Sequence, residues 1–134
     1  MEQNKLKVRV VSFSFKKGIP DDEAGNGGGF IFDCRGIHNP GLYDEYKPLT
    51  GKDAPVIQFL EKEGVITELL KHAEAMVSIS VDTYIKREFT DLMVCFGCTG
   101  GKHRSVYCAE KMAAFLKQSF DIDVVLTHRE YLSW

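Results

Sequence analysis

Residues 92–110 read LMVCFGCTGGKHRSVYCAE, and this stretch decides the fold. An apolar run stops at Gly97 and leads into a glycine-rich turn, three consecutive cationic residues and a segment with helical spacing from Ser105. This order is typical of a buried strand that turns directly into a helix. The glycines let several backbone N–H groups point inward, and the helix N-terminus adds a partial positive charge. We therefore predict that residues 97–105 bind an anion, specifically a phosphate.

A glycine pair between a strand and a helix is also ordinary punctuation in α/β proteins and needs no ligand. Here the turn carries the hydroxyls of Thr99 and Ser105 and the cations of Lys102, His103 and Arg104. Adjacent cations repel one another unless something anionic lies between them, which favours binding over a bare turn.

Several stretches of the chain resemble one known family. They are VSFSFKKGIP at 11–20, FIFDCR at 30–35, Asn39-Pro40, PLTG at 48–51, GCTGGKHRSV at 97–106 and His128-Arg129. Together they are similar to the C-terminal domain of the RapZ family, the bacterial RNase adapter proteins. Full-length members carry an N-terminal nucleotide-binding domain with a Walker A loop. The resemblance therefore implies a free-standing version of the C-terminal domain or a fragment.

The resemblance also implies a domain that senses an amino-sugar phosphate, contacts a small regulatory RNA and self-associates as a homo-oligomer, with a separate NTPase as a further partner. The ligand residues carried over are Thr99, Gly100, His103 and Arg104, with Gly101, Lys102 and Ser105 adjacent. Two departures weaken what the resemblance implies, and they weaken RNA binding more than sugar-phosphate binding. Gly41 stands where many members have histidine after Asn-Pro, and the end of the chain, EYLSW, is not basic. We thus expect weak, salt-sensitive RNA contact at most, through Lys16, Lys102, Arg104 and Arg129.

Composition sets the broad class. With 134 residues, 44% hydrophobic and 27% charged, residues 1–134 are expected to form a single domain with its own core. A net charge of −2 argues against extensive wrapping of nucleic acid. The sequence has no apolar run as long as the roughly 20 residues that span a bilayer. We therefore expect a cytoplasmic protein that does not enter the membrane. The four cysteines are then expected to be reduced thiols.

A metal or cofactor is not predicted. Cys95 and Cys98 have CxxC spacing, but only His103 lies near them, and a tetrahedral zinc site needs a fourth ligand.

Hydrophobic periodicity predicts strands at 6–15, 30–34, 91–98 and 122–126. Helices are predicted between Asp53 and Gly64, from 65 to about 87, and at 105–119. Residues 1–5 are expected to be frayed, and the Gly-rich loop 21–29 to be flexible. Alternating strands and helices indicate a three-layer α/β fold with a mainly parallel sheet of about four strands and helices on both faces.

Parallel strands would bring four loops to one edge of the sheet, each with a cation near its start: Lys16, Arg35, the 102–104 run, and His128 or Arg129.

The loop at 36–52 is long for a compact domain, and such loops tend to be functional. Five polar or glycine residues lie at or within it: Asp33, Arg35, Asn39, Thr50 and Gly51. They are candidates for contact with the same ligand. Asp33 and Arg35 can equally form a local ion pair that braces the loop, and the sequence leaves both possibilities open.

Two enzymatic phosphate loops are alternatives to a turn that only binds an anion. A Walker A loop requires G-x4-G-K-[ST], whereas Gly97 is one residue too close to Lys102 and His103 replaces the hydroxyl residue. Cys98 and Arg104 do fit C-x5-R-[ST], the phosphate loop of cysteine-dependent phosphatases. The pattern itself supplies no general acid for the leaving group, and Asp33 and Asp44 are the candidate residues for that role. Binding without turnover is therefore the preferred hypothesis, with the phosphatase as the alternative.

Overall fold

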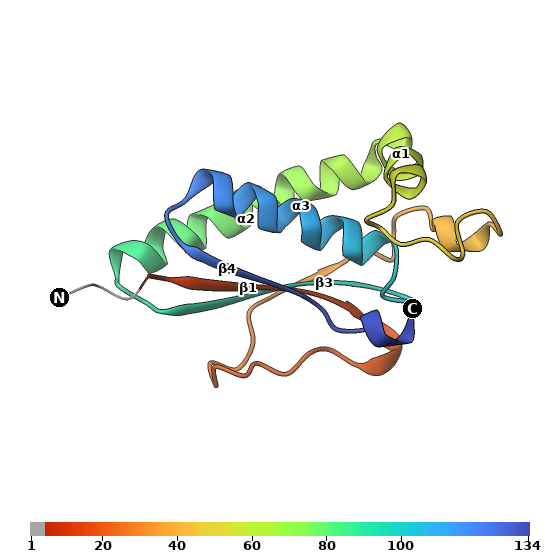
Figure 1. Ribbon diagram of the computed structural model, residues 1–134. Helices are drawn as coiled ribbons and strands as arrows, with labels where there is room; N and C mark the ends of the chain where they lie inside the picture. The colour runs from red at the N-terminus through yellow and green to blue at the C-terminus, as the bar shows by residue number, and fades with distance from the viewer. Residues whose placement is uncertain (1–4) are drawn as a thin grey trace.

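The computed structural model describes residues 5–134 and places three α-helices against one face of a four-stranded sheet (Figure 1). The strands are β1 (Lys7–Ser14), β2 (Phe30–Asp33), β3 (Asp91–Cys98) and β4 (Asp123–His128). The helices are α1 (Ala54–Glu63), α2 (Val65–Lys86) and α3 (Arg104–Ser119). The sheet order is β2-β3-β1-β4 and every pairing is parallel, which confirms the predicted α/β fold.

Strand β3 lies inside the sheet and is buried on both faces, which explains its uninterrupted apolar sequence. Leu92, Val94 and Phe96 belong to the main core under the helices. Met93 and Cys95, which alternate with them, belong to a smaller cluster on the opposite face. The parallel register of β3 with β1 and β2 brings the carboxyl ends of these strands to the same edge as the start of α3.

The helical layer is built on α3, which packs against β1, β3 and β4, while α2 packs on α3 and α1 on α2. The buried residues of α2 form the single stripe expected of an amphipathic helix: Ile66, Leu70, Ala73, Val77 and Val81. Gly64, in the left-handed conformation with φ 81°, ends α1 and lets α2 begin at the next residue.

The face of the sheet opposite the three α-helices differs from the prediction, which placed helices on both faces. The three α-helices lie on one side, and the opposite face is covered by residues 15–29, which contain only the short 3-10 helix η1 (Phe15–Lys17) (Figure 1). The physical reason is composition, because a glycine-rich, acidic segment has neither the helix propensity nor the apolar stripe of a packed helix.

The Asp22 carboxylate organises the loop at 21–29. It accepts hydrogen bonds from the backbone N–H groups of Ala24, Asn26 and Gly28 at 2.9–3.1 Å and is paired with Arg9. Arg9 in turn holds Asp91 at the start of β3. The flexibility predicted for this loop stays a prediction. The fraying predicted for residues 1–5 falls outside the described residues, except at Lys5.

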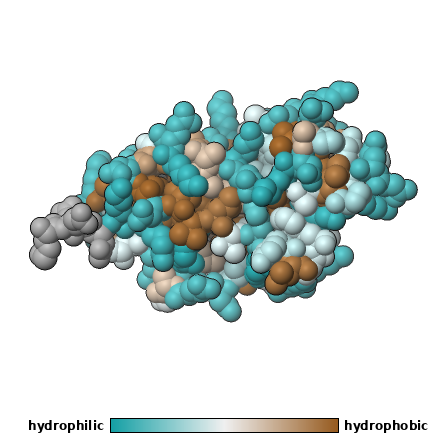
Figure 2. Space-filling view, viewed as in Figure 1, coloured by the Kyte–Doolittle hydropathy of each residue, from teal (hydrophilic) through white to brown (hydrophobic). Residues whose placement is uncertain are grey.

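The surface is mostly hydrophilic in the orientation of Figure 2, with an apolar area over part of α3 and β4. The partly buried apolar side chains of these two elements are Phe115, Val124 and Leu126. Within residues 5–134, no helix is both long and apolar enough to cross a membrane.

The Asp22 network can be tested by Asp22→Ala. Three loop amides lose their acceptor and Arg9 loses one partner, so we expect these amides to exchange hydrogen faster while the fold is retained. Hydrogen exchange followed by mass spectrometry of the loop peptide measures this. Asp21→Ala is the matched control, because Asp21 is exposed and accepts no such bonds. Equal exchange in both variants would contradict the assigned role.

Candidate functional site

The turn between β3 and α3 presents an uncapped helix N-terminus. His103 occupies the N-cap position, and no side chain of the described chain caps the helix there. The first backbone N–H groups of a helix have no partner inside it and carry its partial positive charge. Gly101, with φ 67°, lets the chain turn into the helix.

The three consecutive cationic residues each hold a carbonyl of the long loop. Lys102 Nζ donates to the Lys47 carbonyl at 2.6 Å, and His103 Nε2 to the Tyr46 carbonyl at 2.8 Å. Burial, with repulsion from the neighbouring Lys102 and Arg104, lowers the pKa of His103. A neutral imidazole that donates to a carbonyl is therefore the favoured state.

Arg104 continues the same pattern at the end of β2. Its Nη1 donates to the carbonyls of Arg35, at 3.1 Å, and Ile37, at 2.8 Å. The predicted cluster of cations is thus present, but its members bind the loop over the turn rather than standing free around it.

The guanidinium of Arg104 is not fully satisfied. The residue is 3% exposed, and its Nε is buried without any hydrogen-bond partner in the described chain. Nη2 reaches only the Thr99 hydroxyl, at 3.5 Å. A buried donor without an acceptor is costly, more so when it is charged. An anion with an oxygen at this position would remove that cost.

Cys98 and Ser105 face each other behind the turn. The Cys98 thiol is 1% exposed and donates to Ser105 Oγ at 3.1 Å. Cys34 and Cys108 lie near them with 3.8 Å between their sulfur atoms, and their hydrogen bond, together with burial, raises the pKa of Cys108. Burial also raises the pKa of Cys95 to about 12. All four cysteines are free thiols in the structure. Within residues 5–134, no set of three or more His, Cys, Asp or Glu side chains could hold a metal.

The remaining candidates of the long loop brace it. Asp33 and Arg35 form a bidentate ion pair with contacts of 2.7–3.1 Å, and the guanidinium of Arg35 stacks over the Phe15 ring at 3.9 Å. The hydrogen bond from Arg35 lowers the pKa of Asp33. Asn39 caps the 3-10 helix η2 (Pro40–Leu42), and Thr50 binds the Asp53 carboxylate.

Gly51 is a candidate residue of the long loop that contacts the turn directly. Its N–H donates to the Lys102 carbonyl at 2.9 Å, and a Cβ there would overlap the His103 carbonyl. The structure therefore brings Gly51 to the turn, while Asp33, Arg35, Asn39 and Thr50 are occupied by partners within or beside their own loop.

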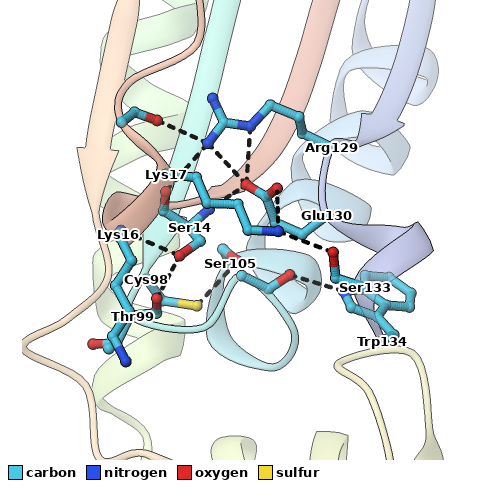
Figure 3. Close-up of polar contacts among 12 residues, drawn as sticks. Ser14, Lys16, Lys17, Cys98, Thr99, Ser105, Arg129, Glu130, Ser133 and Trp134 are labelled. Carbon is cyan, nitrogen blue, oxygen red and sulfur yellow. Dashed lines mark hydrogen bonds and ion pairs between the residues drawn. The ribbon is translucent and has the colours of Figure 1, made fainter.

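Sequence analysis missed Glu130. Its carboxylate is 5% exposed and accepts the Ser14 N–H at 2.8 Å and Arg129 Nε at 2.9 Å (Figure 3). Ser14 Oγ then donates to the Thr99 carbonyl at 2.6 Å, so this network reaches the turn. Glu130 is separated from Ser14 by 116 residues, and no sequence signal connects the two.

The side chains of Arg129 and Trp134, near Glu130, are also bound within the fold. Arg129 donates to the carbonyls of Ser14 and Gly18 as well as to Glu130, so its cation is largely used within the fold. Trp134 Nε1 donates to the Gly101 carbonyl at 3.2 Å, which ties the end of the described chain to the turn (Figure 3). His128 bridges Ser12 and Glu110 and does not face the turn as a free cation.

The surface also has hollows away from the turn. One of about 500 Å³ lies between the loop at 21–29 and the start of β3, lined in part by Tyr84 and Phe89. Its carboxylates Asp22 and Asp91 are already paired with Arg9. The turn before α3 remains the better candidate.

Comparisons with known proteins identify the family of the chain. A family model described as the RapZ C-terminal domain matches residues 6–132. A relative from Fervidobacterium nodosum, named a nucleotide-binding protein, is 38% identical over 123 residues, which are 92% of this chain and 42% of the relative. A relative of the same name from Xanthomonas campestris pv. campestris is 37% identical over 131 residues, 95% of this chain and 43% of its own. The chain thus spans about two fifths of the length of these relatives.

Two glycines of the turn provide a matched pair for mutation. A Cβ on Gly101 would lie 2.7 Å from Glu130 Cγ and 2.9 Å from Ser14 N, at a positive φ, whereas a Cβ on Gly100 meets nothing within 4 Å. We expect Gly101→Ala to lower the free energy of unfolding by about 1–3 kcal/mol. Gly100→Ala should stay within about 0.5 kcal/mol of the parent. Urea unfolding measures both, and equal losses would contradict the geometry.

The buried Glu130 carboxylate should make the free energy of unfolding depend on pH. Burial alone would raise the pKa of its carboxyl, but the Ser14 N–H and the cations of Arg129 and Lys17 outweigh burial, so the pKa lies below the ordinary 4.5. Its contribution to stability is therefore complete above pH 4.5 and is lost as the pH falls through the lower folded value. Unfolding free energies measured below pH 4.5 should fall less steeply in Glu130→Gln than in the parent. Identical slopes would refute this role.

Proposed function

Because the chain belongs to the RapZ C-terminal domain family, we propose that residues 97–105 bind the phosphate group of a small phosphorylated molecule in a regulatory, non-catalytic role. The observation that carries the proposal is the buried Arg104 Nε without a partner, beside an uncapped helix N-terminus. Both features present N–H donors with no acceptor in the described chain. A phosphate supplies several anionic oxygens and would accept from both.

The groups proposed to contact the phosphate are the backbone N–H groups of Gly100 and Gly101, the Thr99 hydroxyl and the Arg104 guanidinium. Gly100 has open space around it, which suits close approach by a ligand. Lys102 and His103 act through the loop that they hold. Ser105, which is fully buried against Cys98, contributes through its backbone N–H in the first turn of α3.

An amino-sugar phosphate is the ligand that the family resemblance implies, and we propose it as the first compound to test. Self-association and a separate NTPase partner stay predictions of the same kind. The name that the relatives carry, nucleotide-binding protein, describes chains more than twice as long as this one.

RNA binding is proposed only as a weak property. Of the four candidate cations, Arg104 is buried and Arg129 is bound to Glu130 and two carbonyls. Lys102 already donates to the Lys47 carbonyl, whereas Lys16 is exposed at the surface. So few phosphate contacts give low, salt-sensitive affinity.

The phosphatase alternative receives less support. A nucleophilic cysteine needs an accessible thiolate, whereas the Cys98 thiol is buried and donates to Ser105. The Arg104 fork that would clamp a phosphoryl group already donates to two loop carbonyls.

Two variants separate binding from phosphatase chemistry. A hydrogen bond to a charged group contributes about 1.5–3 kcal/mol, so Arg104→Ala should weaken binding of inorganic phosphate at least about tenfold. Cys98→Ser keeps the size of the side chain and a donor to Ser105, so its affinity should change little. Calorimetric titration measures both, and the fluorescence of the single tryptophan, Trp134, gives a second readout at the turn.

Because Arg104 also holds the loop, each variant is first compared with the parent by thermal unfolding. Lys102→Ala is the second variant if Arg104→Ala does not fold. It should weaken phosphate binding by less than tenfold, because Lys102 acts through the loop carbonyl that it holds. Unchanged affinity in a folded Arg104→Ala would refute the proposal. Turnover of an aryl phosphate that disappears in Cys98→Ser would establish the phosphatase instead.

A further inference from the structure

The long loop carries a second arrangement of polar groups that the proposed function does not use. The ring of His38 lies between the carboxylate of Glu63, in the last turn of α1, and the hydroxyl of Tyr43. The distances are 2.8 Å from Nδ1 to Glu63 Oε1 and 2.8 Å from Nε2 to Tyr43 Oη. All three groups reach solvent, with exposures of 39% for His38, 44% for Glu63 and 39% for Tyr43.

The order of these groups fixes the position of the proton. An ionised carboxylate can only accept, so the neutral ring of His38 carries its hydrogen on Nδ1 and donates it to Glu63. Nε2 is then the acceptor for the Tyr43 hydroxyl. A hydroxyl on a histidine that a third group orients is the arrangement of an activated nucleophile.

Aromatic packing holds the rings in this geometry. The His38 ring meets Tyr43 edge-on at 5.6 Å and Phe59 at 5.1 Å. Tyr43 and Phe59 also contact each other at 5.8 Å, and both contact Tyr46. Residues from the loop and from α1 therefore fix the imidazole on more than one side, so the hydroxyl does not depend on a single flexible contact.

We propose that Tyr43 is a nucleophile activated by His38 and accepts an acyl group from a small activated ester. The phenolic oxygen attacks the carbonyl carbon of the ester as its proton passes to His38 Nε2, and Glu63 stabilises the resulting imidazolium. The bond from that carbon to the leaving oxygen then breaks, and the imidazolium returns the proton to the leaving group. The acyl group ends on Tyr43, and nothing is oxidised or reduced.

The hydroxyl of Tyr43 is reached from solvent, because Tyr43 is 39% exposed. An acetyl ester is used as the donor because its acyl group is small.

The chain contains its own control. Tyr131 is 60% exposed, more than Tyr43, and its hydroxyl contacts no other side chain in the part of the chain that the structure describes. Exposure alone would therefore make Tyr131 the faster of the two, whereas activation by His38 would make Tyr43 the faster.

The test is acetylation of the intact protein by p-nitrophenyl acetate, with the rate at each tyrosine followed by peptide mass spectrometry. We expect Tyr43 to react at least about 100-fold faster than Tyr131, which is the lower end of what a positioned general base contributes. In His38→Gln and Glu63→Gln the rate at Tyr43 should fall towards that of Tyr131, whose own rate stays unchanged.

The outcomes that overturn the proposal are distinct from a folding defect, because the first comparison uses the unmodified protein. Equal rates at the two tyrosines, or a faster Tyr131, refute activation. A Tyr43 rate that is unaffected in a folded His38→Gln shows that the contacts only brace the loop. Acetyl found on His38 or Lys47 in place of Tyr43 assigns the reactivity to another group. Phosphate binding plays no part in any of these results.

Discussion

The structure depends on how one buried guanidinium is satisfied. Arg104 begins α3, directly after the turn from the central strand, and is almost completely removed from solvent. A charged group in that position must find acceptors, and the carbonyls of Arg35 and Ile37 supply them from a segment more than sixty residues earlier in the chain. This contact fixes the start of the long loop relative to the helix N-terminus. Lys102 and His103 extend the same connection to Lys47 and Tyr46, so one short run of residues sets the position of the whole loop.

The parallel sheet makes that connection possible. Because β1, β2, β3 and β4 run in the same direction, their carboxyl ends and the loops that follow them meet at one edge. The loop after β1 meets the end of the chain there through Ser14 and Glu130. The turn before α3 is thus held on two sides. Lys102 binds the long loop on one side, and Ser14, which also contacts Glu130, binds the Thr99 carbonyl on the other. A site held from several elements keeps its geometry better than one on an isolated loop.

Local features of the sequence predicted most of the fold. The apolar run, the glycines and the helical spacing of residues 92–110 act over a few residues each, and they correctly predicted the strand, turn and helix. The partners of the charged groups could not be found this way. Arg104 was recognised as a donor, but its acceptors are backbone carbonyls, which every residue has and no sequence pattern marks. Glu130 looked like an ordinary surface acid beside Arg129, although it is buried through a contact with Ser14. The layer over β1 and β3 contains no α-helix because residues 21–29 are rich in glycine. The sequence carried this signal, but the prediction of helices on both faces did not take it into account.

The balance of charge decides between a small anion and a polyanion. Most cations at the edge of the sheet are already used: Arg35 by Asp33, Arg129 by Glu130, and Arg104 in part by loop carbonyls. A polyanion such as RNA gains affinity from an excess of exposed cations, whereas the 17 Lys and Arg residues of this chain are outnumbered by 19 Asp and Glu residues. A single phosphate needs only a few convergent donors, and the backbone N–H groups at the start of α3 supply them without any free side-chain charge. The unsatisfied Nε of Arg104 would add direction to the proposed site. The distribution of charge therefore supports the proposal of one compact anion better than that of a long charged backbone.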